Sequence, residues 1–230
     1  MTIGVSLART FALPIDGVEV GAAVETCYYT EYDGIDDAYR SSDAALKLSG
    51  YLTLCCEYKF TTAQFSYFLG NVNFSPYNGI RIETGATGIL YWVAYCSAGS
   101  RQASQITGGY ATGSWIKFVG ICSAAETAFW INGTKCPTVA QGDSSVLAST
   151  TDFAIGSRPD GTSFGNGSIK NIEFYNAAAT TPEAWVYDDP TSLGLTAGNL
   201  VLRTQNGTGT DNAQSLTFTK YGDPVTLECT

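Results

Sequence analysis

Three aspartates have the clearest potential for chemistry, since Asp33, Asp36 and Asp37 supply three carboxylates within five residues. Calcium in proteins takes about six to eight oxygen ligands from carboxylates, backbone carbonyls and waters. The spacing therefore makes this segment a candidate calcium site, although nothing in the sequence requires a cofactor. Alternatively, Asp33 forms the turn at Asp33-Gly34, and the other two carboxylates are solvated or cap the next segment.

The chain of 230 residues contains no histidine. This excludes a Ser-His-Asp or Cys-His catalytic system and zinc bound by imidazole. Two carboxylates that flank a glycosidic bond are a further route to catalysis. However, Glu57, Glu83, Glu126 and Glu173 are isolated in the sequence, so a pair among them would have to form by folding. We expect no catalytic residues and a chain that is not an enzyme.

Aromatic rings exposed beside polar groups are typical of sugar-binding sites. The chain has 14 Tyr, 11 Phe and 4 Trp. Trp92, Trp115 and Trp130 lie in strand-like runs and are expected in the core. Loops cluster at the ends of a β-sandwich, where they can form a binding rim, although each loop residue is also explained as ordinary surface. The candidate ligand-binding residues in predicted loops are Tyr77, Asn78, Arg101, Tyr110, Arg158 and Phe164.

Alternating apolar residues indicate the strands that must position these side chains. In residues 51–60 the even positions are apolar and the odd positions include Thr53, Glu57 and Lys59, as in a half-buried strand. Residues 89–96 are apolar on both faces and predict a central strand. Asn132-Gly133 predicts a type I′ hairpin after residues 128–131. Further strands are expected at 26–32, 65–70, 80–83, 115–123, 153–155, 167–176, 200–203, 216–220 and 225–229, with one short helix at Thr181-Pro182-Glu183.

Charge excludes two classes of partner. The formal net charge is −9, which argues against nucleic acid and against an anionic membrane surface. No apolar run approaches the ~20 residues of a membrane span, so membrane insertion is not expected. The first residues lack the basic and long apolar regions of a signal peptide, and we do not expect one.

The seven cysteines are an odd number, which weighs against a disulfide framework. Cys55, Cys56, Cys96 and Cys122 lie in apolar runs and are expected to be buried free thiols. If a bridge forms, Cys122 and Cys136 are the favoured pair, because they flank the predicted hairpin.

Three longer segments carry a family pattern. Residues 28–40 contain aromatic-Asp-Gly-x-Asp-Asp, residues 113–136 hold a Trp-led strand followed by the Asn-Gly hairpin, and residues 153–185 run from an Ile-Gly strand through Gly-x-Ile-x-x-Ile to Thr-Pro-Glu. In this order they resemble the laminin-G-like domains of the concanavalin A-like lectin/glucanase superfamily. The resemblance implies an all-β jelly-roll sandwich of two antiparallel sheets, and family members often bind carbohydrate or protein, some through Ca²⁺ at the rim.

The glucanases of this superfamily carry Glu-x-Asp-x-x-Glu on one strand face. The most similar segment here runs from Glu31 to Asp36, where the third acid is Asp and Asp33-Gly34 interrupts the strand. The resemblance therefore does not supply a catalytic pair.

The resemblance predicts one domain over 1–230, with a core at about 24–189 and extensions 1–23 and 190–230 that mediate assembly. Our leading hypothesis is a phage virion protein, a capsid decoration, head-fibre or tail-fibre component. It would assemble in the host cytoplasm, lie on the virion surface and adhere to surface glycans. Its partners would be neighbouring virion subunits, with a homo-oligomer or larger assembly expected. The alternatives are a structural subunit without ligand, a glycoside hydrolase of the same superfamily, and an extracellular lectin.

Overall fold

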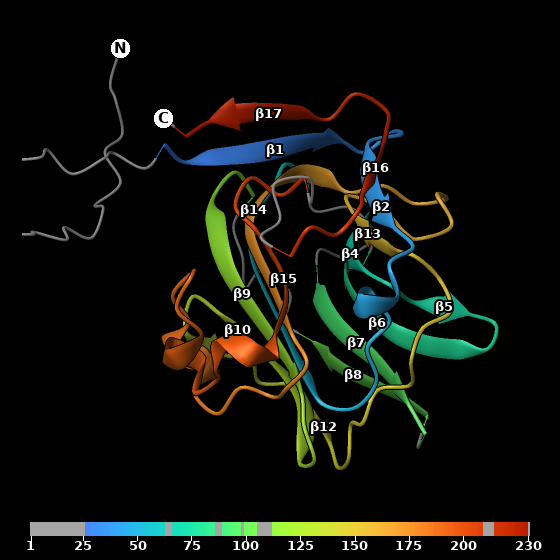
Figure 1. Cartoon of the computed structure of the whole chain (residues 1–230), viewed down its shortest axis with the longest axis vertical. Helices are drawn as coiled ribbons and strands as arrows, with labels where there is room; N and C mark the ends of the chain where they lie inside the picture. The colour runs from blue at the N-terminus through green and yellow to red at the C-terminus, as the bar shows by residue number, and fades with distance from the viewer. Residues whose placement is uncertain are drawn as a thin grey trace, which may run out of the picture.

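Two antiparallel sheets face each other in the computed structural model, which describes residues 26–62, 66–85, 89–97, 99–104, 112–208 and 214–229 (Figure 1). Sheet A has the order β11 (Thr134–Lys135), β10 (Glu126–Ile131), β9 (Trp115–Cys122), β3 (Leu52–Phe60), β14 (Asn166–Tyr175), β1 (Tyr28–Asp33) and β17 (Val225–Glu228), with β12 (Ala140–Gln141) on β10 and β15 (Leu200–Thr204) on β14. Sheet B has the order β16 (Thr219–Tyr221), β2 (Ala38–Ser41), β13 (Phe153–Ile155), β4 (Ser66–Gly70), β6 (Tyr77–Thr84), β7 (Leu90–Cys96) and β8 (Gly99–Ser104), with β5 (Asn73–Phe74) on β6. The predicted all-β fold of two antiparallel sheets is confirmed.

The main core lies between the sheets and follows the period of two in the sequence. The apolar even-numbered residues of β3 belong to it, and so do Ile80 and Ile82 of β6. Trp92 of β7 is fully buried there, and its indole nitrogen donates to the carbonyl of Ile121 at 3.0 Å. Further large rings of this core come from Tyr32, Tyr39, Phe68, Phe118, Phe129, Phe153 and Phe174.

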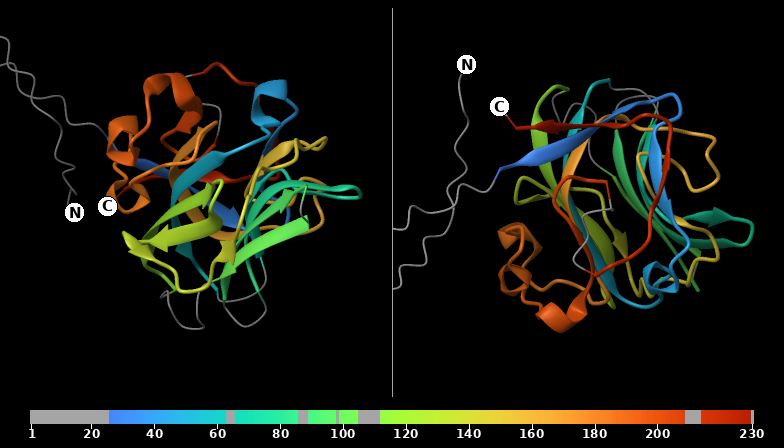
Figure 2. Two further views of the ribbon diagram at one scale, coloured as in Figure 1. Left: turned by 90° about the horizontal axis from the view of Figure 1, so that it is seen from below. Right: turned by 45° about the horizontal axis from the view of Figure 1, so that its top comes forward.

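The outer face of sheet A carries a second apolar layer, which includes Cys55, Tyr175, Trp185 and Leu193. The chain between β14 and β15 lies outside the sheet and supplies part of this layer (Figure 2). Thr53, predicted on an exposed face, is fully buried under the segment that follows β14, and its hydroxyl donates to the carbonyl of Ala177 at 2.8 Å. The expectation that β3 is half-buried is therefore wrong for its first half.

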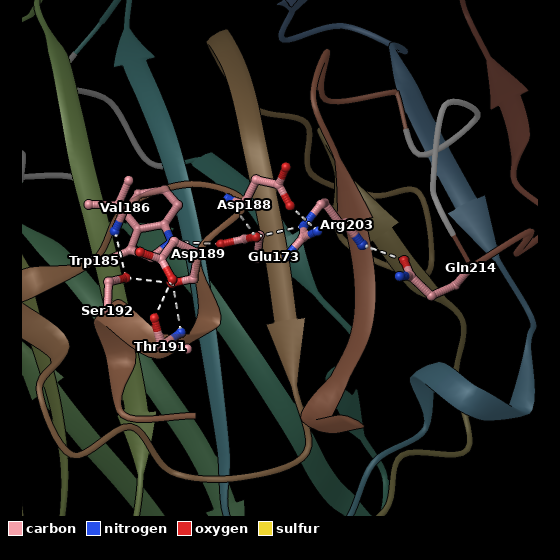
Figure 3. A network of polar contacts seen from close by, with 9 residues as sticks. All are labelled: Glu173, Trp185, Val186, Asp188, Asp189, Thr191, Ser192, Arg203 and Gln214. Atoms are coloured by element: carbon pink, nitrogen blue, oxygen red, sulfur yellow. Dashed lines mark hydrogen bonds and ion pairs between the residues drawn. The ribbon is translucent and has the colours of Figure 1, made fainter. Parts of the chain in front are cut away.

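The buried side chain of Glu173 links the segment between β14 and β15 to sheet A through hydrogen bonds and an ion pair (Figure 3). The carboxylate of Glu173, on β14, accepts hydrogen bonds from the indole nitrogen of Trp185 at 2.7 Å and from the backbone nitrogen of Asp188 at 3.1 Å. Arg203, on β15, pairs with the same carboxylate at 2.8 Å and also with Asp188. A fully buried carboxylate needs such partners, because its desolvation otherwise costs several kcal/mol.

Helical structure in the described residues is limited to four 3₁₀ helices: η1 (Ala44–Leu46), η2 (Pro182–Ala184), η3 (Pro190–Leu193) and η4 (Ala197–Asn199). The single helix expected at Thr181 is thus one turn among several. Thr181 does not cap it, since its hydroxyl donates to the carbonyl of Ser192 at 2.8 Å. None of the helices in these ranges has the length and apolar character needed to cross a membrane.

A disulfide joins Cys27 to Cys229, with 5.3 Å between their Cα atoms. The antiparallel pairing of β1 with β17 places Tyr28 opposite Glu228 and so brings the flanking cysteines together. The pair expected from the sequence, Cys122 with Cys136, is wrong. Cys122, on β9, lies opposite Thr127 on one side of β10, whereas the backbone nitrogen of Cys136 donates to the carbonyl of Phe129 on the other side of β10. Both thiols are free. The predicted buried free thiols are confirmed for Cys55, Cys56, Cys96 and Cys122.

The C-terminal part of the chain belongs to the sandwich. Residues 190–230, expected as an extension, contribute β15 and β17 to sheet A and β16 to sheet B. The expected N-terminal extension, residues 1–23, lies outside the described residues.

Candidate functional site

Two of the six predicted ligand-binding residues contact the same aromatic ring, Phe74, on the outer face of sheet B. Tyr77 is 59% exposed, and its ring lies edge-on to Phe74 with the centroids 6.2 Å apart. The guanidinium of Arg158 lies over the same Phe74 ring, 3.7 Å from its centroid. The structure therefore joins a strongly exposed aromatic ring to a cationic donor of several hydrogen bonds.

The Tyr77 ring is supported from beneath. It stacks on Tyr95 of β7, with centroids 5.2 Å apart and planes 24° apart. The Tyr95 hydroxyl accepts a hydrogen bond from Arg81 at 2.5 Å, and Arg81 pairs with Glu83 at 2.9 Å. We call the group Phe74, Tyr77, Arg81, Tyr95 and Arg158 the Tyr77 surface. Its rings are held in place before any ligand arrives, which lowers the entropic cost of binding.

Tyr67 lies below this group and contributes to its electrostatics. Arg81 and Arg158 both lie over the Tyr67 ring, at 5.8 and 5.7 Å from its centroid. Burial raises the pKa of the Tyr67 phenol above its ordinary 10.0. The ring is therefore neutral at physiological pH, and it attracts the two cations through its π face.

The other predicted residues do not join the Tyr77 surface. Asn78 is only 6% exposed, because it follows Tyr77 along β6 and faces the other side of the sheet. Phe164 is half-buried in a bridge opposite Ser157. Arg101 lies on β8 opposite Ala94, and Tyr110 lies outside the described residues. The expectation of loop positions is wrong for Tyr77, Asn78 and Arg101, which are on strands.

Sequence reasoning missed Phe74, Arg81 and Tyr95, although a signal was present. Odd-numbered residues from 77 to 83 share one face of β6, and the register sets Gly79 opposite Tyr95 on β7. The predicted strand began at residue 80, whereas β6 begins at Tyr77. The first three residues of the strand were therefore missed, and Tyr77 was assigned to a loop.

The three aspartates of the candidate calcium site do come together. One carboxylate oxygen from each of Asp33, Asp36 and Asp37 lies within 4.8 Å of the others. They line a depression of about 600 Å³ at the edge of sheet A, which Asn166 and Asp223 also line. These hard oxygen donors suit calcium better than a softer transition metal.

The turn predicted as the alternative is also present. A carboxylate oxygen of Asp33 accepts from the backbone nitrogen of Ile35 at 2.7 Å, as in an Asx turn. The two Asp37 oxygens accept from the backbone nitrogens of Asp33 at 3.0 Å and of Asp223 at 2.7 Å. Burial raises the pKa of Asp37, and the charges of Asp33 and Asp36 add to this rise. A bound cation would offset this repulsion.

The four isolated glutamates each lie beside a basic side chain. The pairs are Glu57–Lys170 at 3.6 Å, Glu83–Arg81 at 2.9 Å, Glu126–Lys135 at 2.5 Å and Glu173–Arg203 at 2.8 Å. Each of these four acids is therefore ion-paired in the folded protein.

Comparisons with known proteins agree with this architecture. A laminin G family model, described as the concanavalin A-like lectin/glucanases superfamily, matches residues 33–185. No curated protein matches the chain. A heptameric SAP-like pentraxin from Limulus polyphemus is similar in structure, with a TM-score of 0.59 and 14% identity over 88% of this chain and 94% of the pentraxin.

Two further solved structures are similar in fold. A Bacteroides ovatus protein whose proposed role is carbohydrate binding has a TM-score of 0.63 and 13% identity over 88% of this chain and 60% of its own. Domains LG4-5 of the mouse laminin α1 chain have a TM-score of 0.51 and 16% identity over 70% of this chain and 44% of theirs. Because the family model spans most of the sandwich, this chain belongs to the laminin-G-like family of the concanavalin A-like lectin/glucanase superfamily.

Proposed function

We propose that this chain is a non-catalytic carbohydrate-binding protein and that the Tyr77 surface holds the sugar. The main support is the Tyr77 ring, which is 59% exposed and stacks on the Tyr95 ring with the two centroids 5.2 Å apart. One face of a pyranose is lined by C–H groups that pack on an aromatic ring, while its hydroxyls need donors and acceptors. Arg158 lies over the neighbouring Phe74 ring and carries N–H donors within the same surface.

A printed array of neutral and acidic glycans tests the proposal. We expect Tyr77→Ala to weaken binding at least tenfold and Tyr77→Phe to retain it, because stacking needs the ring and not the hydroxyl. Tyr51→Ala is the matched control, since Tyr51 is 39% exposed and immediately precedes β3 of the other sheet. A blank array, or full binding by Tyr77→Ala, would overturn the proposal. Release of reducing sugar from any bound glycan would favour the hydrolase alternative.

We also propose that the chain assembles through β17, with a second copy as its partner. β17 is the terminal strand of sheet A, and its outward side chains Val225 and Leu227 are 52% and 36% exposed. An edge strand with apolar side chains favours pairing with another strand. We expect Leu227→Lys to shift the protein toward the monomer in light scattering. An unchanged mass would contradict assembly through this edge.

Incorporation into a phage virion and a location on its surface stay predictions. The Cys27–Cys229 disulfide supports a site of action outside a reducing cytoplasm, which suits both a virion surface and the extracellular alternative. Detection of the chain in purified phage particles would test the virion role, and its absence from them would contradict it.

A further inference from the structure

A groove of about 470 Å³ lies on the outer face of sheet A, on the opposite sheet from the Tyr77 surface. Its lining includes Glu57, Trp115, Lys117, Asn132, Glu183 and Trp185. We propose that this groove is a second, independent carbohydrate site and that its ligand is an uncharged pyranose oligosaccharide. The proposal does not depend on sugar binding at the Tyr77 surface.

The floor of the groove offers an acceptor beside a donor. The register of β3 on β9 sets Glu57 directly opposite Lys117, so both side chains project from the same face of the sheet. Asn171 donates to one Glu57 oxygen at 2.9 Å and fixes the orientation of the carboxylate. Neighbouring hydroxyls of a pyranose are recognised by such a pairing, in which one hydroxyl donates to an acid and the next accepts from an ammonium.

Two indoles contribute to the lining. The Trp115 ring is half-buried, packs edge-on against Tyr29 with centroids 5.4 Å apart, and has the Lys170 ammonium over it at 4.5 Å from its centroid. Trp185 is only 4% exposed, and its indole nitrogen donates to Glu173 at 2.7 Å. Rings whose positions are fixed by other contacts lose little entropy when a ligand packs against them.

A tight turn closes the end of the groove. Asn132 has a φ of 50° and its side-chain oxygen accepts from the backbone nitrogen of Lys117 at 2.8 Å. A Cβ at Gly133 would lie 3.1 Å from the carbonyl oxygen of Glu183, so the hairpin tip packs directly against η2. The hairpin and the outer segment therefore enclose the groove from two sides.

The charges in and beside the groove argue for an uncharged ligand. Glu57 and Glu183 contribute two negative charges. Positive charge comes from Lys117, from Lys170 at 3.6 Å from Glu57, and from Lys59, whose ammonium lies 5.4 Å from the centroid of the Trp115 ring. An acidic sugar would meet both carboxylates, and a cationic ligand would meet the three ammonium groups. Hydroxyl groups can use the donors and the acceptors without leaving a charge unpaired.

NMR of the indole N–H signals can locate binding, because the chain has only four tryptophans. The probes are maltotriose, cellotriose and N,N′-diacetylchitobiose, with a glucuronic-acid disaccharide as the acidic comparison. We expect at least one neutral probe to shift the Trp115 and Trp185 signals saturably while the signals of Trp92 and Trp130 stay in place. Trp→Phe variants assign the four signals.

Variants separate this site from the other one. We expect Lys117→Met and Glu57→Gln each to weaken binding of the neutral probe at least tenfold when the Kd is read from the Trp115 signal, which reports this groove and not the Tyr77 surface. Lys135→Met, which removes an exposed lysine of the neighbouring hairpin, is the control. Unmoved Trp115 and Trp185 signals with all three neutral probes, full affinity in Lys117→Met, or tighter binding of the acidic disaccharide would each overturn the proposal.

Discussion

The indole nitrogen of Trp185 donates a 2.7 Å hydrogen bond to Glu173, a carboxylate with no exposed surface. This contact joins the segment outside sheet A to a strand within the sheet. It therefore positions part of the groove lining as well as stabilising the fold.

Glu173→Ala should lower the free energy of unfolding by about 3 kcal/mol, because it leaves the Trp185 nitrogen without its acceptor and removes one of the two carboxylates that pair with Arg203. Urea unfolding followed by circular dichroism measures this change. Glu126→Ala is the control, since it breaks an exposed pair with Lys135 and should cost at most about 1 kcal/mol. Equal losses in the two variants would show that the buried network adds no stability.

The double variant Cys27→Ser/Cys229→Ser should lose roughly 2–5 kcal/mol of unfolding free energy, because the bond spans 202 residues and restricts the unfolded chain. Urea unfolding measures the loss, and reduced wild-type protein should match the variant. Peptide mapping without reduction identifies the linked pair. A peptide that links Cys122 to Cys136 would contradict the observed pairing.

Calcium should raise the melting temperature of the wild type and not that of Asp36→Asn. A ligand that binds only the folded state stabilises it by about 2.7 kcal/mol at a concentration of 100 times its Kd. Asp36 suits this test because its carboxylate is exposed, whereas Asp33 and Asp37 accept turn hydrogen bonds. Asp143→Asn, in another exposed Asx turn, is the control. An equal response in Asp36→Asn would remove the trio as ligands.

Asp37 should titrate above its ordinary pKa of 3.8, chiefly because burial disfavours its charged form. As pH rises, the unfolded chain releases this proton first. The stability that protonated Asp37 contributes is therefore complete below pH 3.8 and is lost as pH passes the higher pKa of the folded state. Carbon-13 NMR of the carboxyl groups measures the midpoint, with protein in concentrated urea as the reference. A folded-state midpoint at or below that reference would contradict the expectation.

Local sequence predicted those features that depend on neighbours along the chain. Alternation in residues 51–60 correctly identified the core face of β3, since an inward side chain recurs at every second position. The burial of Thr53 could not be read in the same way, because its partners, Ala177 and Ala179, lie more than a hundred residues away. The Cys27–Cys229 pair likewise has no local signal.

The two candidate sites also differ in whether their residues are neighbours along the chain or come together only on folding. The three aspartates were found because their spacing alone brings them together. Arg158 reaches Phe74 only after sheet B has formed, so the sequence could identify Arg158 and Tyr77 separately but could not show that both contact Phe74. Trp115 was expected in the core because it was assigned to the interior of a strand, yet it is the first residue of β9 and lies half-buried beside the groove.

The disulfide also has a mechanical consequence. Cys27 and Cys229 are covalently joined. A force that pulls the chain before Cys27 away from the chain after Cys229 is therefore carried by the disulfide and is not transmitted to the strands between the two cysteines. Hydrogen bonds between β1 and β17 would then bear almost none of the load, and a pull that separates the two chain ends cannot unzip the sheet until the bond is reduced.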